Sequence, residues 1–180
     1  FRYKFSENFL ITNIEIDVNT LKLKDKIFNE IEFLLDKNIF RVNKNDILNK
    51  FEELNYLENI QIKKNYPSTL RIKARQTDLI AITYINQKKF FLGINGKFIE
   101  SNKITTESKL PIIFGKFNIS EYFMLQKKLI QFDINHNEII KYFFHKSKRW
   151  DLHFENGVLV KFPNKNISEA LKVYKEFKIK

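Results

Sequence analysis

The chain has 180 residues, enough for one domain of ordinary size or for two small ones. Hydrophobic residues make up 43% of it and 19 residues are Phe, so the composition excludes disorder of the main body and provides for a packed core. Cysteine is absent, which excludes disulfides, thiolate nucleophiles and Cys-ligated metal sites.

The formal net charge of +11 favours a negatively charged neighbour, such as nucleic acid, an anionic membrane surface or an acidic partner protein. A solvated, Lys-rich surface of the kind that an AT-rich genome produces accounts for the same charge equally well. The basic residues are spread along the chain, with clusters at residues 146–149 and 88–89. No apolar run approaches the ~20 residues needed to span a bilayer.

The first half of the chain predicts five elements in the order β-α-α-β-β. Alternating apolar and polar residues indicate strands, and apolar residues three or four apart indicate helices. Asn43, followed by Asp46 three residues later, resembles a capping box at the start of the second helix. We expect one face of the sheet to pack on both helices. The elements are a strand at 14–18, helices with apolar faces at 27–35 and 47–54, and strands at 60–63 and 70–75.

The second half predicts more strands, together with two helices. Asn95-Gly96 is suited to a type I′ hairpin turn, and Asn156-Gly157 predicts another turn. Ser120 is expected to cap the first helix, and the last helix is expected to direct apolar residues as far as Phe177 inward. Residues 110–115 are expected to form a buried crossing segment that ends at a glycine. The expected strands lie at 80–84, 89–93, 97–100, 138–144, 150–155 and 158–162, and the helices carry apolar faces at 122–132 and 167–177.

No set of residues is arranged for catalysis or for metal binding. His136, His145 and His153 lack metal-ligand spacing, and we expect them to be solvated or on edge strands. Phosphate-binding glycine loops, nucleophile elbows and zinc-protease motifs are missing. The chain is therefore expected not to be an enzyme and to need no cofactor.

Nucleic-acid binding is a separate hypothesis because of the charge. Aromatic and basic residues do interleave at residues 142–146. The order of elements, however, fits neither an RNA-recognition motif nor a helix-turn-helix, and aromatic residues at strand spacing usually belong to a core. We expect no nucleic-acid partner.

Residues 54–72 combine an alternating strand, an aromatic-proline turn at Tyr66-Pro67 and a Leu-x-Ile strand. This order is similar to the POTRA domain of the FtsQ/DivIB family of bacterial cell-division proteins, whose pattern begins Leu-Pro-Trp-Val. Asn38-Ile39-Phe40 resembles the Asn-Leu-Phe link between the two helices of that domain.

The second half carries further segments similar to the same family. Residues 91–99 resemble its segment ending in Gly-x-Phe, and residues 110–115 match its Leu-Pro-x-x-x-Gly. Trp150 and Leu152, followed by Asn156-Gly157, match its Trp-x-Leu hairpin. The single motifs are short, but their order along nearly the whole chain is specific.

The resemblance implies an α+β fold with an N-terminal POTRA domain (β-α-α-β-β), followed by a β-rich domain of antiparallel hairpins with two flanking helices. The expected organisation is a juxtamembrane segment at residues 1–8, the POTRA domain at 9–77 and the β domain at 78–180. Family members continue into a final partner-binding strand, which we expect to be absent here. The family's Glu-Arg-x-Pro-x-Ala junction is reduced to an alanine in residues 76–81, so the joint between the domains is expected to differ.

By resemblance, the chain is a non-catalytic scaffold of the divisome that contacts FtsB and FtsL in the periplasm and is able to self-associate weakly. It is expected to be anchored in the inner membrane at the division septum by a helix outside this chain. The alternative that the fold leaves open is a POTRA component of outer-membrane protein assembly or secretion.

Four residues are expected to bind partners. Lys146, Lys148 and Arg149 are placed to meet acidic residues of a partner helix, although a solvated loop explains them equally well. Tyr174 is included as a contact, with anchoring of the last helix as its alternative, and Trp150 is expected in the core.

Overall fold

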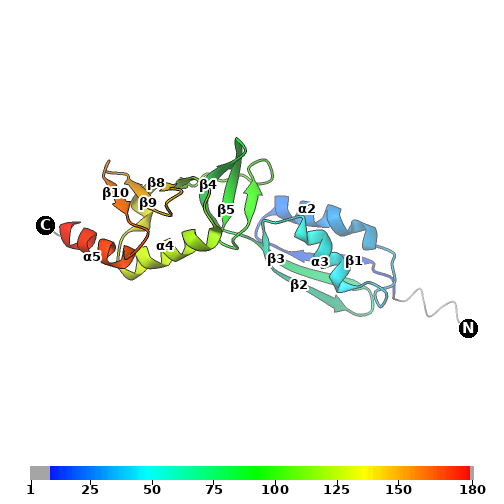
Figure 1. Cartoon of the computed structure of the whole chain (residues 1–180). Helices are drawn as coiled ribbons and strands as arrows, with labels where there is room; N and C mark the ends of the chain where they lie inside the picture. The colour runs from blue at the N-terminus through cyan, green and yellow to red at the C-terminus, as the bar shows by residue number, and fades with distance from the viewer. Residues whose placement is uncertain (1–8, 179–180) are drawn as a thin grey trace, which may run out of the picture. The chain divides into compact units, whose positions relative to one another are not determined.

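The computed structural model describes residues 9–178, which form two compact units divided between Asp78 and Leu79 (Figure 1). The segment expected to be juxtamembrane, residues 1–8, lies outside the described residues. Each unit has a sheet and helices of its own. The α+β class, the N-terminal POTRA-like region and the β-rich second region with two helices are confirmed.

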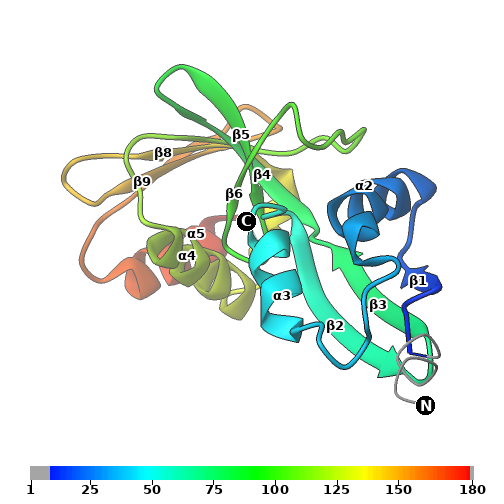
Figure 2. The ribbon, with the colours of Figure 1, turned by 90° about the vertical axis from the view of Figure 1, so that its right-hand side faces the viewer.

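The first unit contains a small sheet of three strands in the order β1-β3-β2, with β1 parallel to β3. Both α-helices lie on one side of this sheet (Figure 2). The expected order β-α-α-β-β is therefore confirmed. The elements are β1 (Asn13–Asp17), α2 (Leu21–Ile31), a 3-10 turn (Glu32–Leu34), α3 (Lys44–Glu52), β2 (Leu57–Asn65) and β3 (Thr69–Gln76).

Side-chain caps and apolar spacing fix the two helices. The Thr20 hydroxyl accepts a hydrogen bond from the Leu23 N–H at the start of α2, and the Asn43 side chain accepts one from the Asn45 N–H at the start of α3. The expected helix through residue 35 is too long, because α2 tightens into a 3-10 turn after Ile31. Leu54 likewise lies beyond the end of α3.

The strand β3 shows the expected alternation. Leu70, Ile72 and Ala74 are buried, and the basic residues between them are exposed. Those basic residues face carboxylates on the neighbouring strands, with N···O distances of 2.6 Å for Arg71–Glu15 and 3.3 Å for Lys73–Asp17. The exposed cations of β3 are thus paired with carboxylates of the neighbouring strands.

The second unit contains a large sheet of seven strands in the order β10-β9-β8-β7-β4-β5-β6. Residues from α4 and α5 share one hydrophobic core with residues from one face of this sheet, so both helices cover the same face. The elements are β4 (Leu79–Ile85), β5 (Lys88–Gly93), β6 (Phe98–Glu100), β7 (Ile112–Phe114), α4 (Ile119–Gln131), a 3-10 turn (His136–Glu138), β8 (Ile139–Phe144), β9 (Trp150–Phe154), β10 (Leu159–Phe162) and α5 (Ile167–Lys178).

The large sheet contains more than antiparallel hairpins. Strand β7 pairs in parallel with both β4 and β8, which joins the hairpins β4–β5 and β8–β9 into one sheet. Parallel strands need a long connection, and α4 supplies it between β7 and β8. The hydroxyl of buried Thr83 donates to the carbonyl of Ile113 at 3.0 Å, adding a side-chain hydrogen bond to this seam.

The turn types differ from those expected. Gly96 has a positive φ and donates to the Gly93 carbonyl, but Asn95 does not have the positive φ that a type I′ turn requires. The type I′ prediction is therefore wrong, and the loop is a turn followed by a left-handed glycine. The two-residue loop with positive φ at both positions is Asn86-Gln87, between β4 and β5.

Two other local predictions are also wrong. Asn118, rather than Ser120, caps α4, because its side chain accepts from the helix and Glu121 bonds back to the Asn118 N–H in a complete capping box. Phe177 does not point inward, since 75% of it is exposed. The strand predicted at residues 80–84 is present as β4, with Ala81 and Thr83 buried on its inner face and Tyr84 exposed on the other.

Gly115 offers a test of the seam made by β7. It has φ +101°, and a Cβ at this position would lie 2.1 Å from the Phe144 carbonyl oxygen. Left-handed strain and backbone overlap together predict that Gly115→Ala lowers the free energy of unfolding by about 3 kcal/mol or more. The measurement is urea unfolding followed by the fluorescence of Trp150, the single tryptophan.

Gly157→Ala is the matched control. Gly157 also has a positive φ, +84°, but nothing lies within 4 Å of the added Cβ. Only the strain remains, so the expected loss is about 1 kcal/mol. Equal losses in the two variants would show that the close approach to Phe144 does not constrain the sheet.

Candidate partner-binding site

The three basic residues predicted to bind a partner lie in one loop, the β8–β9 hairpin at residues 145–149. The loop is closed by a hydrogen bond of 3.0 Å from the His145 N–H to the Arg149 carbonyl. A second bond of 2.8 Å runs from the Lys148 N–H to the His145 carbonyl, and Lys148 adopts a positive φ of 61°. The hairpin is therefore a tight, internally bonded turn.

Arg149 is held in place by Asp151. Its guanidinium donates two hydrogen bonds to the two carboxylate oxygens, at 2.8 and 3.1 Å. His145 Nε2 lies 2.9 Å from the same carboxylate, and Asp151 is only 6% exposed. Burial would raise the pKa of Asp151, but the hydrogen bonds from Arg149 and His145 outweigh it and hold that pKa below its usual range. Arg149 thus shapes the hairpin as well as adding charge to it.

Lys146 and Lys148 line an open groove of about 620 Å³ beside the hairpin. Phe98, Phe117 and Phe144 contribute apolar side chains to the same groove. The Lys148 ammonium lies 4.0 Å from the Glu121 carboxylate, whose other role is to cap α4. The groove can therefore accept an apolar side chain whose neighbour carries a negative charge.

The base of the hairpin is aromatic. Trp150 is buried, as expected for a core residue, and its ring centroid lies 4.7 Å from that of Phe144 and 6.3 Å from that of Tyr142. This packing, together with the Asp151 ion pairs, fixes the position of the hairpin relative to the sheet.

Tyr174 lies apart from the hairpin loop, on α5. Its ring centroid is 5.5 Å from that of Phe154 and 6.1 Å from that of Phe162, and the residue is packed against the core. The structure therefore places Tyr174 where it positions α5 against β9 and β10, which is the anchoring alternative of the sequence analysis.

One feature of the site is not apparent in the sequence. The alternation of Asp151 with apolar residues is typical of the solvated face of a strand, yet its side chain is buried against Arg149 and His145, and Arg149 two residues before it is the one local signal for an ion pair. The large sheet also has an edge at β10, whose one neighbour among the described residues is β9. Phe162 of β10 pairs with Trp150, so this edge ends beside the basic hairpin.

Within residues 9–178, no group of three His, Asp or Glu side chains is arranged to hold a metal ion. None of the described helices is both long enough and apolar enough to cross a membrane.

Comparison with known proteins agrees with this architecture. Residues 9–75 match the FtsQ-type POTRA domain family. The chain is 24% identical over 124 residues to the cell division protein FtsQ of Rhizobium radiobacter, an alignment that covers 69% of this chain and 59% of that protein. It is 29% identical over 144 residues to FtsQ of Rickettsia bellii, covering 74% of this chain and 50% of that protein. The chain is therefore similar to FtsQ and DivIB proteins, and its residues 9–75 match the FtsQ-type POTRA domain.

DivIB proteins are also similar. The cell division protein DivIB of Clostridium botulinum is 28% identical over 114 residues, covering 63% of this chain and 44% of that protein. The solved major extracytoplasmic domain of DivIB from Geobacillus stearothermophilus is 16% identical with a TM-score of 0.39, covering 55% of this chain and 88% of that one. The chain spans about half the length of the FtsQ and DivIB proteins that it matches.

Asp151→Asn tests whether the carboxylate holds the hairpin. The amide cannot neutralise Arg149, so we expect a loss of about 1–2 kcal/mol in the free energy of unfolding at pH 7. The pKa of Asp151 is depressed in the folded protein, so its contribution is present above the unfolded-state pKa and is lost as the pH falls through the folded-state pKa. The difference between wild type and variant should therefore shrink in acid, which urea unfolding at pH 7 and pH 3 measures.

The control for Asp151→Asn is Asp133→Asn. Asp133 also pairs with a cation, Lys175 at 2.7 Å, but its side chain is almost fully exposed. Little change in stability is expected from it. If Asp133→Asn lowers the free energy of unfolding as much as Asp151→Asn does, the effect comes from removing any carboxylate and not from the pair in the hairpin.

Proposed function

We propose that this chain is the extracytoplasmic part of a non-catalytic division scaffold, which docks the divisome proteins FtsB and FtsL at the septum. The proposal rests on the length of the alignments with FtsQ proteins. The alignments of 124 and 144 residues are longer than the POTRA segment at 9–75, so they extend into the second unit. The relationship therefore includes the unit that carries the basic hairpin.

The proposed mode of docking is addition of a partner strand to the edge of β10. An edge strand presents unpaired N–H and C=O groups, and a partner strand that pairs with them gains affinity from its backbone. Leu159 on this strand is 46% exposed, which gives such a partner an apolar contact. Because β10 ends beside Lys146 and Lys148, acidic residues of the partner would be attracted to the same place.

The edge of the small sheet at β2 is less suited to strand addition. Its pairing with β3 is irregular between Glu58 and Gln61, and Lys63 and Lys64 add charge to it. Bulges and charged side chains are features that protect sheet edges from new pairing. We therefore assign FtsB and FtsL to the second unit, and the POTRA unit to other division proteins.

The proposed location follows from the same family. The chain would lie in the periplasm, held at the inner membrane by a helix outside residues 9–178 and concentrated at the septum. The rival role in outer-membrane protein assembly loses support, because the matching POTRA family is the FtsQ type.

Binding of the FtsB and FtsL ectodomains from the same organism tests the proposal. We expect Lys146→Glu combined with Lys148→Glu to lower the association rate about tenfold at low salt, because steering by charge is lost. Surface plasmon resonance at two salt concentrations measures it. Arg149 is left unchanged because its loss would also release Asp151.

The control is Lys127→Glu combined with Lys172→Glu, which changes the net charge equally on exposed positions of α4 and α5. At physiological salt, rates within about twofold of wild type are expected for it, because exposed charges beyond the Debye length of about 8 Å are screened. Failure of the wild-type chain to bind either ectodomain would refute the proposal, and so would equal losses in both double variants.

A further inference from the structure

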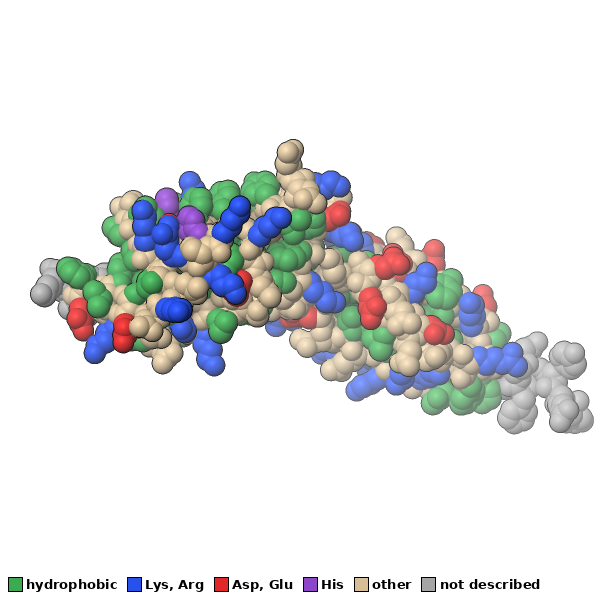
Figure 3. All heavy atoms as spheres, viewed as in Figure 1, with side chains coloured by type: hydrophobic (Ala, Val, Ile, Leu, Met, Phe, Trp, Pro, Cys, Tyr) green, Lys and Arg blue, Asp and Glu red, His purple; other side chains and the backbone are tan. Residues whose placement is uncertain are grey.

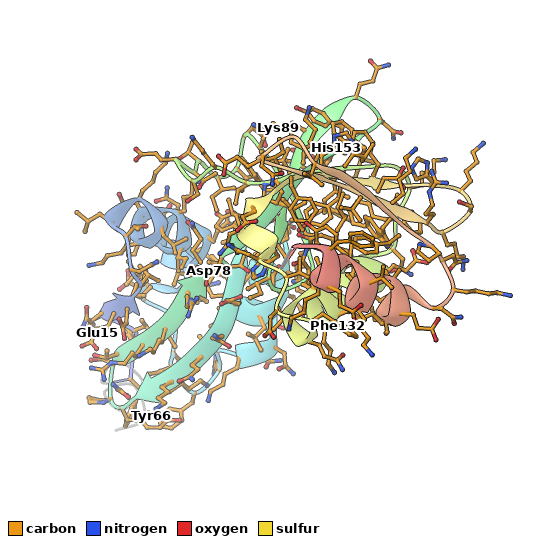
Figure 4. All side chains as sticks on the ribbon, turned by 90° about the vertical axis from the view of Figure 1, so that its left-hand side faces the viewer. Glu15, Tyr66, Asp78, Lys89, Phe132 and His153 are labelled. Atoms are coloured by element: carbon orange, nitrogen blue, oxygen red, sulfur yellow. The ribbon has the colours of Figure 1, made fainter. Side chains whose placement is uncertain are left out.

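The face of the large sheet opposite α4 and α5, here called the outer face, has a chemistry of its own. Figure 4 shows Lys89 and His153 on this side of the sheet, with α5 and Phe132 on the other. Strand register brings Phe114, Phe143 and Asp151 into one row across β7, β8 and β9. The next row contains Ile112, Lys141 and His153 from the same strands.

The middle of the outer face is an aromatic stripe over β7, β8 and β9. The ring of Phe114 stacks on that of Phe143 at a centroid distance of 4.8 Å, and the His153 ring lies 4.9 Å from Phe143. All three side chains are half-buried. Both helices of the second unit pack on the opposite face, so within the described residues no helix covers this stripe.

The charge around the stripe is positive and lacks carboxylate partners. Lys141 lies within it, Lys161 flanks it on β10 and Lys89 lies beyond it on β5, and none of these three forms an ion pair in the part of the chain that the structure describes. The carboxylate in the row, Asp151, is already paired with Arg149 and hydrogen-bonded to His145. Figure 3 shows histidine, hydrophobic and basic side chains next to one another over the β8–β9 region.

The small sheet provides the contrast. There the cations on the exposed face of β3 are paired with carboxylates of β1 and β2, at N···O distances of 2.6 to 3.4 Å. The outer face, with unpaired lysines around an apolar stripe, presents a surface complementary to an acidic and apolar ligand.

We propose that the outer face is a docking site for an acidic amphipathic helix of a partner protein. Three adjacent strands are about 10 Å across, which matches the diameter of about 10 Å of one α-helix. The apolar side of such a helix would cover Phe114, Phe143 and Ile112, and its carboxylates would reach Lys141 and Lys161. The site uses side chains on the face of the sheet, whereas strand addition would use the backbone edge of β10, and the site does not depend on the proposed function.

The geometry favours a helix over nucleic acid or a membrane. The rings of Phe114, Phe143 and His153 contact one another, so they offer few free faces on which bases stack. A membrane surface is best bound by apolar side chains that project into it. Here the aromatic side chains are half-buried in the sheet surface, and a carboxylate lies in the same row.

The experiment uses a synthetic helix of ~18 residues, with leucine along one side and glutamate on the other, labelled for fluorescence anisotropy. The same peptide with lysine in place of glutamate is the charge control. We expect the acidic peptide to bind the chain and the basic peptide not to bind. Amide chemical shifts should change for β7, β8 and β9 and remain constant for α4 and α5.

Variants of the chain locate the site. Lys141→Glu combined with Lys161→Glu should weaken binding of the acidic peptide about tenfold or more, and Phe143→Thr by a similar factor. The matched controls are Lys127→Glu with Lys172→Glu for charge, and Val173→Thr on α5 for apolar area, each expected within about twofold of wild type. Circular dichroism verifies that each variant is folded. The double variant Lys141→Glu, Lys161→Glu is altered only at exposed positions, so it tests the site even if Phe143→Thr unfolds.

Several results would overturn the proposal. One is equal binding of the acidic and basic peptides, and another is equal weakening by the outer-face and control variants. Shifts confined to α4, α5 or the small sheet would also contradict it. Binding to vesicles of anionic phospholipid or to single-stranded RNA, sensitive to Lys141→Glu, without binding of the acidic peptide would assign the face to another ligand class. FtsB and FtsL are absent from these measurements, so their outcome is independent of the β10 test.

Discussion

The large sheet depends on the hydrogen bonds of one short strand, β7. Its residues 112–114 pair in parallel with β4 on one side and β8 on the other, and they are the connection through which the two groups of hairpins form one sheet. The chain can pass directly from β7 along β8 because position 115 is glycine, and a side chain there would overlap the Phe144 carbonyl. Without this seam neither face of the sheet would be continuous.

The seam also determines which residues share a face. On the inner side it aligns Thr83, Ile113 and Tyr142, all buried beneath α4, whose Gln126 donates to the Tyr142 hydroxyl at 2.9 Å. Burial raises the pKa of Tyr142 to about 12, so this phenol stays neutral in any physiological medium. On the outer side the same register aligns Phe114 with Phe143. The core and the proposed helix site are thus two consequences of a single set of backbone pairings.

Local patterns in the sequence predicted most of the fold, because alternation, helical spacing and turn residues act over a few positions. They failed where the cause was not local. The parallel placement of β7 depends on strands far away in sequence, and its three residues are too few to show a period. The turn at Asn86-Gln87 lacks the glycine by which such turns are recognised. In the site, Lys146, Lys148 and Arg149 come together because they are neighbours in sequence, whereas the burial of Asp151 depends on two partners that cover it.

The net charge of +11 does not show which basic side chains have carboxylate partners, and the ion pairs of the structure do. In the small sheet, lysine and arginine on β3 face carboxylates on both neighbouring strands, so their charge is compensated within the sheet. In the second unit, Arg149 is paired, while Lys141 and Lys161 have no carboxylate within ion-pair distance among the described residues. Charges that lack internal partners act on external ones, and at physiological salt they act over only about 8 Å. The unpaired lysines of the outer face would therefore act on a bound partner at short range, rather than through a long-range field around the whole chain.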